Sequence, residues 1–320
     1  MHDSDYAGSD ERLCASLEGR SLLRTDDLSP RELDELLALA LRLKAEEDRP
    51  SWEGRRSVAI LFQKPSLRTR VTFDLGVRQL GGHPVVLGPA EVGLGTREAA
   101  RDVAGNLNRF VDAIVARVFA HATLEELRDN CRIPVLNALS DREHPCQALA
   151  DLLTLRERSG ALDGLRLAWL GDGNNVLHSL MLAGAMAGMS VAAACPEGYW
   201  PAPEIVETAR GLAGDPARIV LTADPAVALA AADAVYTDTW VSMGQEEERA
   251  ARLRVFAPYQ VNAAAMAQAK PDALFMHCMP AHRGEEVTDE VMDGGSSVVF
   301  DQAENRLHAQ KAVMLALIGY

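Results

Sequence analysis

Short apolar runs rich in β-branched residues alternate along the chain with segments in which apolar residues recur every three or four positions. The first pattern is typical of buried strands, and the second places apolar side chains on one face of a helix. The runs that predict strands lie at residues 57–62, 84–88, 112–118, 133–139, 165–171, 190–195, 218–222, 233–238, 273–278 and 297–300. Such regular alternation predicts an α/β fold with parallel sheets and helices on both faces.

Two of the intervening segments show a clear helical face. The shared faces are Phe73, Val77 and Leu80 in the first helix, and Ala100, Val103, Leu107 and Phe110 in the second. A further segment, residues 179–195, carries no charge and resembles a short membrane span. Because it is dominated by alanine and glycine and is shorter than the usual span, we expect a buried helix and then a buried strand, with a break near Gly188.

One long helical pattern, "HPCQALADLLTLRERSG", interrupts the alternation, which restarts at Leu165. The sequence therefore predicts two doubly wound parallel-sheet domains joined by this helix, with a boundary near residue 145. In open parallel sheets, ligands bind beyond the carboxyl ends of the strands. The residues that follow each strand are thus the first candidates for a functional site.

The chain is acidic, because its 320 residues include 32 Lys and Arg against 46 Asp and Glu, for a formal net charge of −14. An acidic protein repels phosphate backbones and anionic lipids, so we expect neither nucleic acid nor a membrane as a partner. The composition, 48% hydrophobic and 24% charged, is that of a globular protein long enough for two domains. Any anion site must then be a local basic pocket.

The cysteines and the amino terminus favour a cytoplasmic protein. There are five cysteines and no C-x-x-C pair, which fits a reducing compartment and argues against a disulfide framework or a zinc ribbon. The first residues, "MHDSDYAGSDER", lack the basic and apolar regions of a signal peptide.

The stretch "FQKPSLRTR" concentrates hydroxyl and guanidinium groups just after a predicted strand. Ser66 can cap a helix whose free N–H groups and partial positive charge suit a phosphate. Arg68 and Arg70 add charge, and Thr69 adds a donor. Basic residues in a first turn oppose the helix dipole by roughly a few tenths of a kcal/mol, which a bound anion would offset. A capped surface helix is the alternative.

Two later segments place donors on predicted helices. In "EHPCQALAD", His144 and Gln147 lie at a helix start and can both donate toward a carbonyl or phosphate oxygen. In "DQAENRLHAQKAVM", which predicts a carboxyl-terminal amphipathic helix, Arg306 is the candidate. The alternatives are incidental polar residues at a helix start and a solvated arginine.

The turn "WLGDGNNVLHS" follows a strand and contains Gly-x-Gly, so a dinucleotide site has to be considered. The full fingerprint needs a third glycine where Val176 stands, and no acidic residue ends the next strand. Nicotinamide binding is therefore disfavoured, and Asn174 and Asn175 can instead bind a small polar ligand.

Two further segments follow predicted strands. "YTDTWVSMGQEEE" places Asp238 where it can pair with an amine or cap a helix, and "LFMHCMPAHRGEEV" contains Cys278. A metal site with His277 and His282 is disfavoured by their spacing across a proline and by the lack of a C-x-x-C partner. A nucleophilic cysteine, which would need a base beside it, and a buried strand-end cysteine both remain open.

Together and in this order, these segments resemble the aspartate/ornithine carbamoyltransferase family, and in particular its ornithine branch. "PSLRTR" is similar to the carbamoyl phosphate motif of the family, usually Ser-Thr-Arg-Thr-Arg, and "HPCQ", "DTWVSMGQEEE", "HCMPAHRGEEV" and "AENR" are similar to its other blocks. The resemblance extends from about Leu22 to the carboxyl terminus. The "SMG" and "HCMP" blocks are specific to the ornithine branch, and the lysine loop of the aspartate branch has no counterpart.

The resemblance implies a carbamoyl phosphate-binding domain at residues 1–145, completed by a C-terminal helix at about 304–320 that packs back on it, and an ornithine-binding domain at residues 146–303. The residues implied in carbamoyl phosphate binding are Ser66, Leu67 by its backbone, Arg68, Thr69, Arg117, His144, Gln147, Cys278, Met279 by its backbone, and Arg306. Those implied in ornithine binding are Asn175, Asp238, Ser242 and Met243. The implied catalytic residues are Arg68, His144 and Cys278, with no covalent step at the cysteine.

The implied reaction transfers the carbamoyl group of carbamoyl phosphate to the side-chain amine of L-ornithine, giving L-citrulline and phosphate in arginine biosynthesis. It requires no metal and no organic cofactor. The implied assembly is a homotrimer, or a multiple of trimers, with active sites at subunit interfaces.

Two positions depart from the pattern of the family. Leu67 replaces the usual threonine, and relatives that act on acylated ornithine also carry Ser-Leu-Arg-Thr-Arg. The alternatives are therefore a carbamoyltransferase for N-acylated ornithine or putrescine, or a non-catalytic phosphometabolite-binding protein. Gly93 stands where many relatives have a glutamine that reaches a neighbouring site, which leaves that contact between subunits open.

Overall fold

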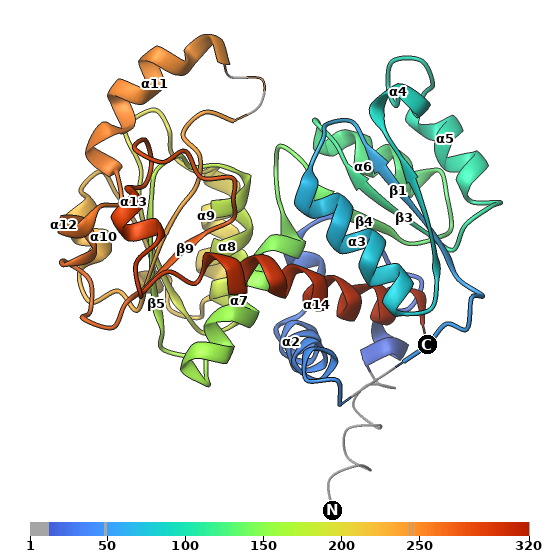
Figure 1. The fold of residues 1–320 in the computed structure, drawn as a ribbon, viewed down its shortest axis with the longest axis horizontal. Coiled ribbons are helices and arrows are strands. Elements are labelled where there is room, and N and C mark those ends of the chain that lie inside the picture. Colours follow the sequence, from blue (N-terminus) through green and yellow to red (C-terminus); the bar gives the residue numbers. More distant parts are fainter. Residues whose placement is uncertain (1–12, 48–49, 243, 245, 320) are drawn as a thin grey trace, which may run out of the picture. The chain divides into compact units, whose positions relative to one another are not determined.

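The computed structural model describes residues 13–47, 50–242, 244 and 246–319. The chain divides into two compact units (Figure 1). Unit 1 comprises Met1–Leu153 and Glu304–Tyr320, and unit 2 comprises Thr154–Ala303. The boundaries fall inside helices α7 (Pro145–Ser159) and α14 (Val299–Ile318). The chain therefore passes between the units within these two helices.

In the described part of unit 1, four parallel strands form one sheet in the order β2-β1-β3-β4. They are β1 (Ser57–Phe62), β2 (His83–Leu87), β3 (Ala113–Arg117) and β4 (Val135–Leu139). The central strand β1 pairs Ile60 with Val86 on one side and with Val115 on the other. Its apolar run is buried on both faces, as a parallel strand covered by helices requires.

Helices α3 (Leu67–Gln79), α5 (Ala100–Leu107) and α6 (His121–Asp129) flank this sheet. α3 contacts β1 and β2, whereas α5 packs with α6. Val103 and Leu127 of the α5–α6 pair join Leu61 and Ile114 of the sheet in one apolar cluster. The shorter α4 (Pro89–Val92) ends at Gly93, which has φ +62°.

Helix α2 (Pro30–Lys44) shows why its sequence starts a helix where it does. The side chain of Ser29 accepts the N–H of Glu32, and the Glu32 carboxylate accepts the N–H of Ser29. Pro30 occupies the first helical position, where no N–H is needed.

The carboxyl-terminal helix α14 packs on unit 1, as expected. Nε1 of Trp52 donates to the carbonyl of Gly319 at 2.7 Å, and the N–H of Gly19 donates to the carbonyl of Leu317 at 2.9 Å. Gly76 of α3 faces the same helix, because a Cβ at Gly76 would lie 3.1 Å from Cε of Met314. Absence of a side chain at Gly76 thus permits close packing of α3 on α14.

In the described part of unit 2, five parallel strands form a sheet in the order β7-β6-β5-β8-β9. They are β5 (Arg166–Leu170), β6 (Ser190–Ala194), β7 (Ile219–Thr222), β8 (Ala234–Thr237) and β9 (Leu274–His277). The helices of this unit include α8 (Asn175–Met186), α9 (Pro203–Leu212), α10 (Pro225–Leu229), α11 (Arg249–Phe256), α12 (Ala263–Met266) and α13 (Asp289–Met292).

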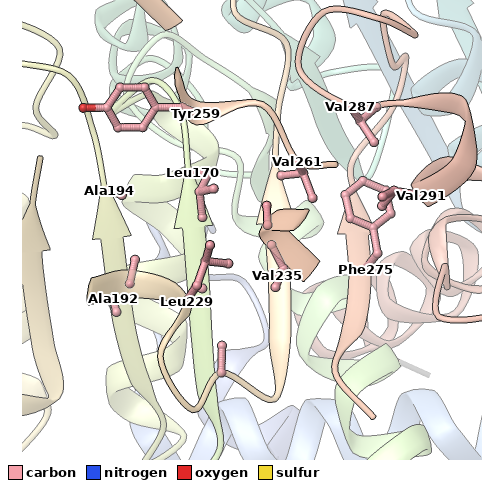
Figure 2. Close-up of a cluster of buried hydrophobic side chains, with 14 of the residues drawn as sticks. Leu170, Ala192, Ala194, Leu229, Val235, Tyr259, Val261, Phe275, Val287 and Val291 are labelled. Carbon is pink, nitrogen blue, oxygen red and sulfur yellow. The ribbon is translucent and has the colours of Figure 1, made fainter. Parts of the chain in front are cut away.

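One face of the unit 2 sheet carries an extended apolar core (Figure 2). Leu170, Val235 and Phe275 come from neighbouring strands and pack with Leu229 of α10 and Val291 of α13. The pair α8 and α9 contributes the other helical contacts of the sheet, at β6 and β7. Unit 2 is thus a parallel sheet with a helical layer of its own, and the expected fold class is confirmed.

Nine of the predicted strands are confirmed to within two residues at each end, but residues 297–300 are not a strand. Ser297 forms only an isolated bridge with Phe275 of β9, and Val299 already begins α14. The apolar run is short, and the strong helix formers that follow it decide the local structure.

The predicted helical face that included Phe110 is also wrong at that residue. α5 ends at Leu107, and the N–H of Phe110 donates to the Leu107 carbonyl in a turn. The side chain of Phe110 is 72% exposed. The uncharged segment 179–195, in contrast, is helix α8 followed by strand β6, as expected. In the part of the chain that the structure describes, no helix has both the length and the apolar character needed to cross a bilayer.

Each strand order creates a topological switch point. In unit 1 the chain leaves β1 for β2 on one side and reaches β3 on the other, so the loops after β1 and β3 diverge. In unit 2 the loops after β5 and β8 diverge in the same way. Ligands bind at such points in open α/β sheets, which directs attention to these four loops.

Candidate functional site

The segment after β1 forms a hydroxyl-rich helix start. Ser66 is the N-cap of α3, and its Oγ accepts the N–H of Thr69 at 3.2 Å and donates to Thr69 Oγ1 at 3.1 Å. Nη2 of Arg306 also donates to Thr69 Oγ1, at 2.9 Å. With both acceptor positions of this oxygen filled, the hydroxyl proton of Thr69 can be donated to a ligand.

Leu67 contributes backbone rather than side chain to this helix start. Its side chain is 74% exposed. As the first residue of α3, it presents an N–H that helix geometry leaves without an intrahelical acceptor. Leu67, which stands where the Ser-Thr-Arg-Thr-Arg motif has threonine, therefore keeps the backbone N–H that a phosphate would use.

His144 lies in a buried and strongly positive region of unit 1. Its side chain is buried, and burial lowers its pKa well below the ordinary value. Positive charge lowers the pKa further, from Arg306, Arg117, Lys64 and Arg68 in order of effect. The imidazole is therefore neutral near pH 7 and can donate an N–H without adding to the local charge.

The positive side chains reach this region from separate segments. Arg68 lies in the first turn of α3, Arg117 ends β3, and Arg306 lies in α14. Arg117 is only 8% exposed and Arg306 only 2%. Because like charges repel strongly in a medium of low dielectric constant, this concentration of cations favours binding of a compact, multiply charged anion.

Gln147, in the first turn of α7, has a fixed carboxamide. Its Nε2 donates to Oδ1 of Asp151 at 2.8 Å. Its Oε1 is buried and accepts no hydrogen bond from any described residue, so it can accept an N–H from a ligand. Burial raises the pKa of the neighbouring Cys146 to about 12, which keeps that thiol protonated and unreactive.

Lys64 belongs to the same region, although the sequence analysis did not select it. Its Nζ lies 5.1 Å from the centre of the Phe119 ring. Burial and the neighbouring charge of Arg117 lower the pKa of Lys64 to about 8. The signal was present in the sequence, since Lys64 lies two residues before Ser66 in "FQKPSLRTR".

In unit 2, the turn after β5 positions an acidic side chain from another loop. Oδ1 of Asn174 caps α8 by accepting the N–H groups of Val176 and Leu177. Nδ2 of Asn174 donates to Oδ2 of Asp238 at 2.8 Å. The sequence offered Asn174 as a contact for a small polar ligand, and in the structure its carboxamide orients Asp238. Asn175, the first residue of α8, is the neighbouring candidate for contact with a ligand.

The Gly-x-Gly of this turn has a structural cause. A Cβ at Gly173 would lie 2.2 Å from the backbone nitrogen of Pro201 and 2.7 Å from the carbonyl oxygen of Tyr199. The N–H of Gly173 donates to that carbonyl at 2.9 Å. Glycine is required here for backbone packing, so the dinucleotide interpretation loses the feature that motivated it.

Asp238 and Cys278 follow the adjacent strands β8 and β9 and meet directly. The thiol of Cys278 donates to Oδ1 of Asp238 at 3.0 Å, and Asp238 is only 7% exposed. A nucleophilic cysteine requires the thiolate, whereas this thiol is a hydrogen-bond donor. The pair favours a polar site that orients a ligand over a covalent one.

Ser242 lies half-buried in the loop after β8. Arg252 of α11 anchors this loop, because its Nε donates to the carbonyl of Trp240 at 2.5 Å and its guanidinium pairs with Asp172 of the turn after β5. Burial raises the pKa of Asp172, and the charge of Arg252 opposes that shift. Met243, expected to contact ornithine, lies outside the described residues.

Metal-ligating side chains gather in two places within the described residues. The groups are Asp238, His277 and Cys278, and His282, Glu285 and Glu286, each with ligand atoms within 4.8 Å of one another. In the first group, both ring nitrogens of His277 are engaged, by the N–H of Met279 and by Glu286. In the second, Glu285 pairs with Arg249. Hydrogen bonds and an ion pair account for these side chains, so neither group requires a metal.

The residues selected from the sequence thus fall into two sets. Unit 1 contains Ser66, Leu67, Arg68, Thr69, Arg117, His144, Gln147 and Arg306, and unit 2 contains Asn175, Asp238, Ser242, Cys278 and Met279. The first set places positive charge and hydrogen-bond donors around His144. The second provides a carboxylate and a thiol for a polar ligand.

Comparison with known families matches both units. The family described as aspartate/ornithine carbamoyltransferase, carbamoyl-P binding domain, matches residues 20–157. The family described as aspartate/ornithine carbamoyltransferase, Asp/Orn binding domain, matches residues 163–317. The candidate residues of both units lie within these two matches, and Arg306 of unit 1 lies in the second match.

Individual proteins named ornithine carbamoyltransferase are similar over almost the whole chain. That of Rhodococcus opacus is 52% identical over 304 residues, which cover 94% of this chain and 96% of the relative. That of Thermus thermophilus is 51% identical over 299 residues, with 93% and 97% covered. The solved structure of ornithine carbamoyltransferase from Pyrococcus furiosus superimposes with a TM-score of 0.90 at 46% identity, and covers 94% of this chain and 97% of that one.

Proposed function

Because the chain belongs to the aspartate/ornithine carbamoyltransferase family, we propose that it transfers the carbamoyl group of carbamoyl phosphate to the side-chain amine of L-ornithine, releasing L-citrulline and phosphate. Relatives at about half identity that are named ornithine carbamoyltransferase support ornithine as the acceptor. We place this transfer in arginine metabolism.

The observation that carries this proposal is the convergence of Arg68, Arg117 and Arg306 on a neutral, buried His144. Carbamoyl phosphate bears a dianionic phosphate and a carbonyl that becomes negative during attack. Guanidinium groups bind phosphate through paired, charge-assisted hydrogen bonds, and the amides at the start of α3 add uncharged donors.

In the proposed mechanism, negative charge develops on the carbonyl oxygen as the amine attacks the carbamoyl carbon. Arg68, Thr69 and His144 donate hydrogen bonds to that oxygen. One such preorganised donor is typically worth about 3–4 kcal/mol in the transition state. Gln147, through its buried Oε1, accepts an N–H of the carbamoyl group and sets the orientation of its plane.

The attacking amine must be neutral, whereas free alkylamines are mostly protonated near pH 7. Asp238 and Cys278 orient the amine of ornithine, while Asn175, Ser242 and Met243 bind its amino-acid end. The departing phosphate accepts the proton that the amine releases. Direct attack on an activated carbonyl needs no covalent intermediate at Cys278 and no added cofactor.

The experiment that tests this function compares acceptors. Purified protein is supplied with carbamoyl phosphate and with L-ornithine, N-acetylornithine or putrescine, and both phosphate and carbamoylated product are measured. We expect L-ornithine to have a kcat/KM at least about a hundredfold above the others, because a site built to pair polar groups rejects analogues that leave them unpaired. Preference for another acceptor would reassign the substrate. Binding of carbamoyl phosphate without turnover of any acceptor would make the protein non-catalytic.

We also propose a homotrimer, or a multiple of trimers, in the cytoplasm. Leu67, Val71 and Leu75 lie four residues apart on α3 and are 74%, 43% and 42% exposed. Such an apolar stripe on one helix face is typical of a surface covered by another subunit. All five cysteines are free thiols, which fits a reducing compartment.

Gly93 ends α4 with a positive φ, and a Cβ there would lie 2.7 Å from Cβ of Arg97, so the turn itself requires glycine at this position.

A further inference from the structure

The carboxylate of Glu286 lies at the centre of a buried hydrogen-bond network in unit 2. Its side chain is 0% exposed. Oε1 accepts the backbone N–H of His282 and lies 3.3 Å from Nε2 of His277. Oε2 is also buried and has no hydrogen-bond partner among the residues that the structure describes. Because burying a carboxylate is costly, its retention here calls for a specific structural task.

The first arm of this network holds the segment that contains Cys278. Nδ1 of His277 accepts the N–H of Met279 at 2.9 Å. In a neutral ring the proton then lies on Nε2, which donates it to Glu286. Met279 has φ +61°, a left-handed conformation that is strained for a residue with a side chain. The hydrogen bond from Met279 to His277 therefore stabilises a strained backbone directly after the cysteine.

The second arm holds the loop after β8. Oγ1 of Thr239 donates its proton to the carbonyl of Val241 at 3.1 Å. It therefore accepts a hydrogen bond from Nδ1 of His282, which lies 3.0 Å away. That same Nδ1 lies 3.6 Å from Oε1 of Glu286. Thr239 directly follows Asp238, so the orientation of the loop that carries Asp238 depends on this contact.

We propose that Glu286 is a positioning residue for the acceptor substrate. Through His277 and His282 it fixes the two loops that present Cys278 and Asp238 to the amine. This inference rests on the proposed function, since it concerns the ornithine site. Glu286 contacts neither Cys278 nor Asp238 by a hydrogen bond of its own, so it acts only through the two histidines.

The test uses three variants of the full chain, and a fourth replaces Glu286→Ala if that variant does not fold. Glu286→Ala leaves two buried donors without their acceptor, and we expect it to raise the KM for ornithine at least tenfold, about 1.4 kcal/mol, with the KM for carbamoyl phosphate within about twofold. Glu286→Gln retains an acceptor oxygen and is expected within about threefold of the wild type. Glu285→Ala is the matched control, because this neighbour is partly exposed and pairs with Arg249 instead. We expect it to leave both KM values unchanged.

Equal rises in both KM values, or an unchanged KM for ornithine in folded Glu286→Ala, would overturn the proposal. If that variant does not fold, His282→Ala decides, because the His282 ring is 42% exposed and its loss is tolerable. We expect this variant to raise the KM for ornithine about threefold. An unchanged KM for ornithine would refute the role of the second arm. Failure of the proposed function is distinct, since the wild type itself would then form no citrulline from ornithine.

Discussion

At the residue scale, Arg68 provides the simplest test of the proposed electrostatics. Arg68→Ala removes one donor to the developing negative charge, and we expect kcat for citrulline formation to fall by about 10²–10³. Arg70→Ala is the control, because Arg70 lies two residues further along α3 and is exposed. Its kcat is expected within about twofold of the wild type. A loss below about tenfold for Arg68→Ala, roughly 1.4 kcal/mol, would contradict the assignment.

The sequence selected candidate residues from local motifs, whereas the residues that support these candidates are found only in the structure. Asn174 was considered only as a ligand contact and Glu286 was not considered, because their supporting tasks come from contacts set by the tertiary fold and from burial. The hydrogen bond from Asn174 Nδ2 to Asp238, for example, joins residues 64 positions apart in the chain. Burial and long-range pairing are set by the tertiary fold, so single-sequence patterns do not reveal them.

At the scale of elements, the ion pair of Arg252 with Asp172 joins α11 to the turn after β5. The two side chains are 4% and 13% exposed. Arg252→Met would leave a buried carboxylate without its partner, and we expect the free energy of unfolding to fall by about 3 kcal/mol or more. Urea denaturation measures this change. Arg249→Met is the control, because Arg249 lies three residues earlier and its side chain is 47% exposed. It should change the free energy of unfolding by no more than about 0.5 kcal/mol. Similar losses in the two variants would contradict the importance of the buried pair.

Helix α14 contains a histidine whose titration affects stability. Burial lowers the pKa of His308 to about 4, and the charges of Lys311 and Lys44 act in the same direction while Glu304 opposes them. The unfolded chain takes up this proton near pH 6.5, so the unfolded state binds more protons between about pH 6.5 and 4. The free energy of unfolding must therefore decrease as the pH falls through that range.

We expect His308→Gln to make this decrease shallower. Urea midpoints of the wild type and the variant, measured at several values between about pH 7 and 4, give the comparison. Other groups titrate in the same range, so only the difference between the two proteins reports on His308. Parallel curves would show that His308 does not take part.

The element scale also shows where sequence patterns suffice. Runs such as 57–62 and 190–195 are strands because β-branched and small apolar residues buried on both faces leave few alternatives. The run 297–300 has the same composition, yet only Ser297 bridges to β9 before α14 begins. The anchoring of the loop after β8 depends on the contact of Arg252 with Asp172, 80 residues away, so no local pattern predicts it.

At the scale of the whole molecule, the positive site occurs in a chain with a net charge of −14. An acidic surface repels nucleic acid and anionic lipid, whereas a small buried group of arginines still attracts a compact dianion at short range. Local and global charge therefore act on different partners, and the net charge is no obstacle to phosphate binding.

The proposed trimer gives a prediction at the same scale. We expect light scattering on the eluted protein to give a mass three times that of the 34.6 kDa chain, or a multiple of it. Leu75→Glu places a charge in the apolar stripe of α3 and should reduce the mass to that of a single chain. Val227→Glu, at a similarly exposed position of α10, is the control and should leave the assembly intact. A single-chain mass for the wild type would contradict the trimer.

A crystal structure with an unreactive phosphonate analogue of carbamoyl phosphate tests the central claim most directly. The phosphonate is expected at the start of α3, within hydrogen-bond distance of Arg68, Arg117 and Arg306, with its carbonyl oxygen directed at His144. Density for the analogue at any other place, with these side chains unchanged, would contradict the proposed site.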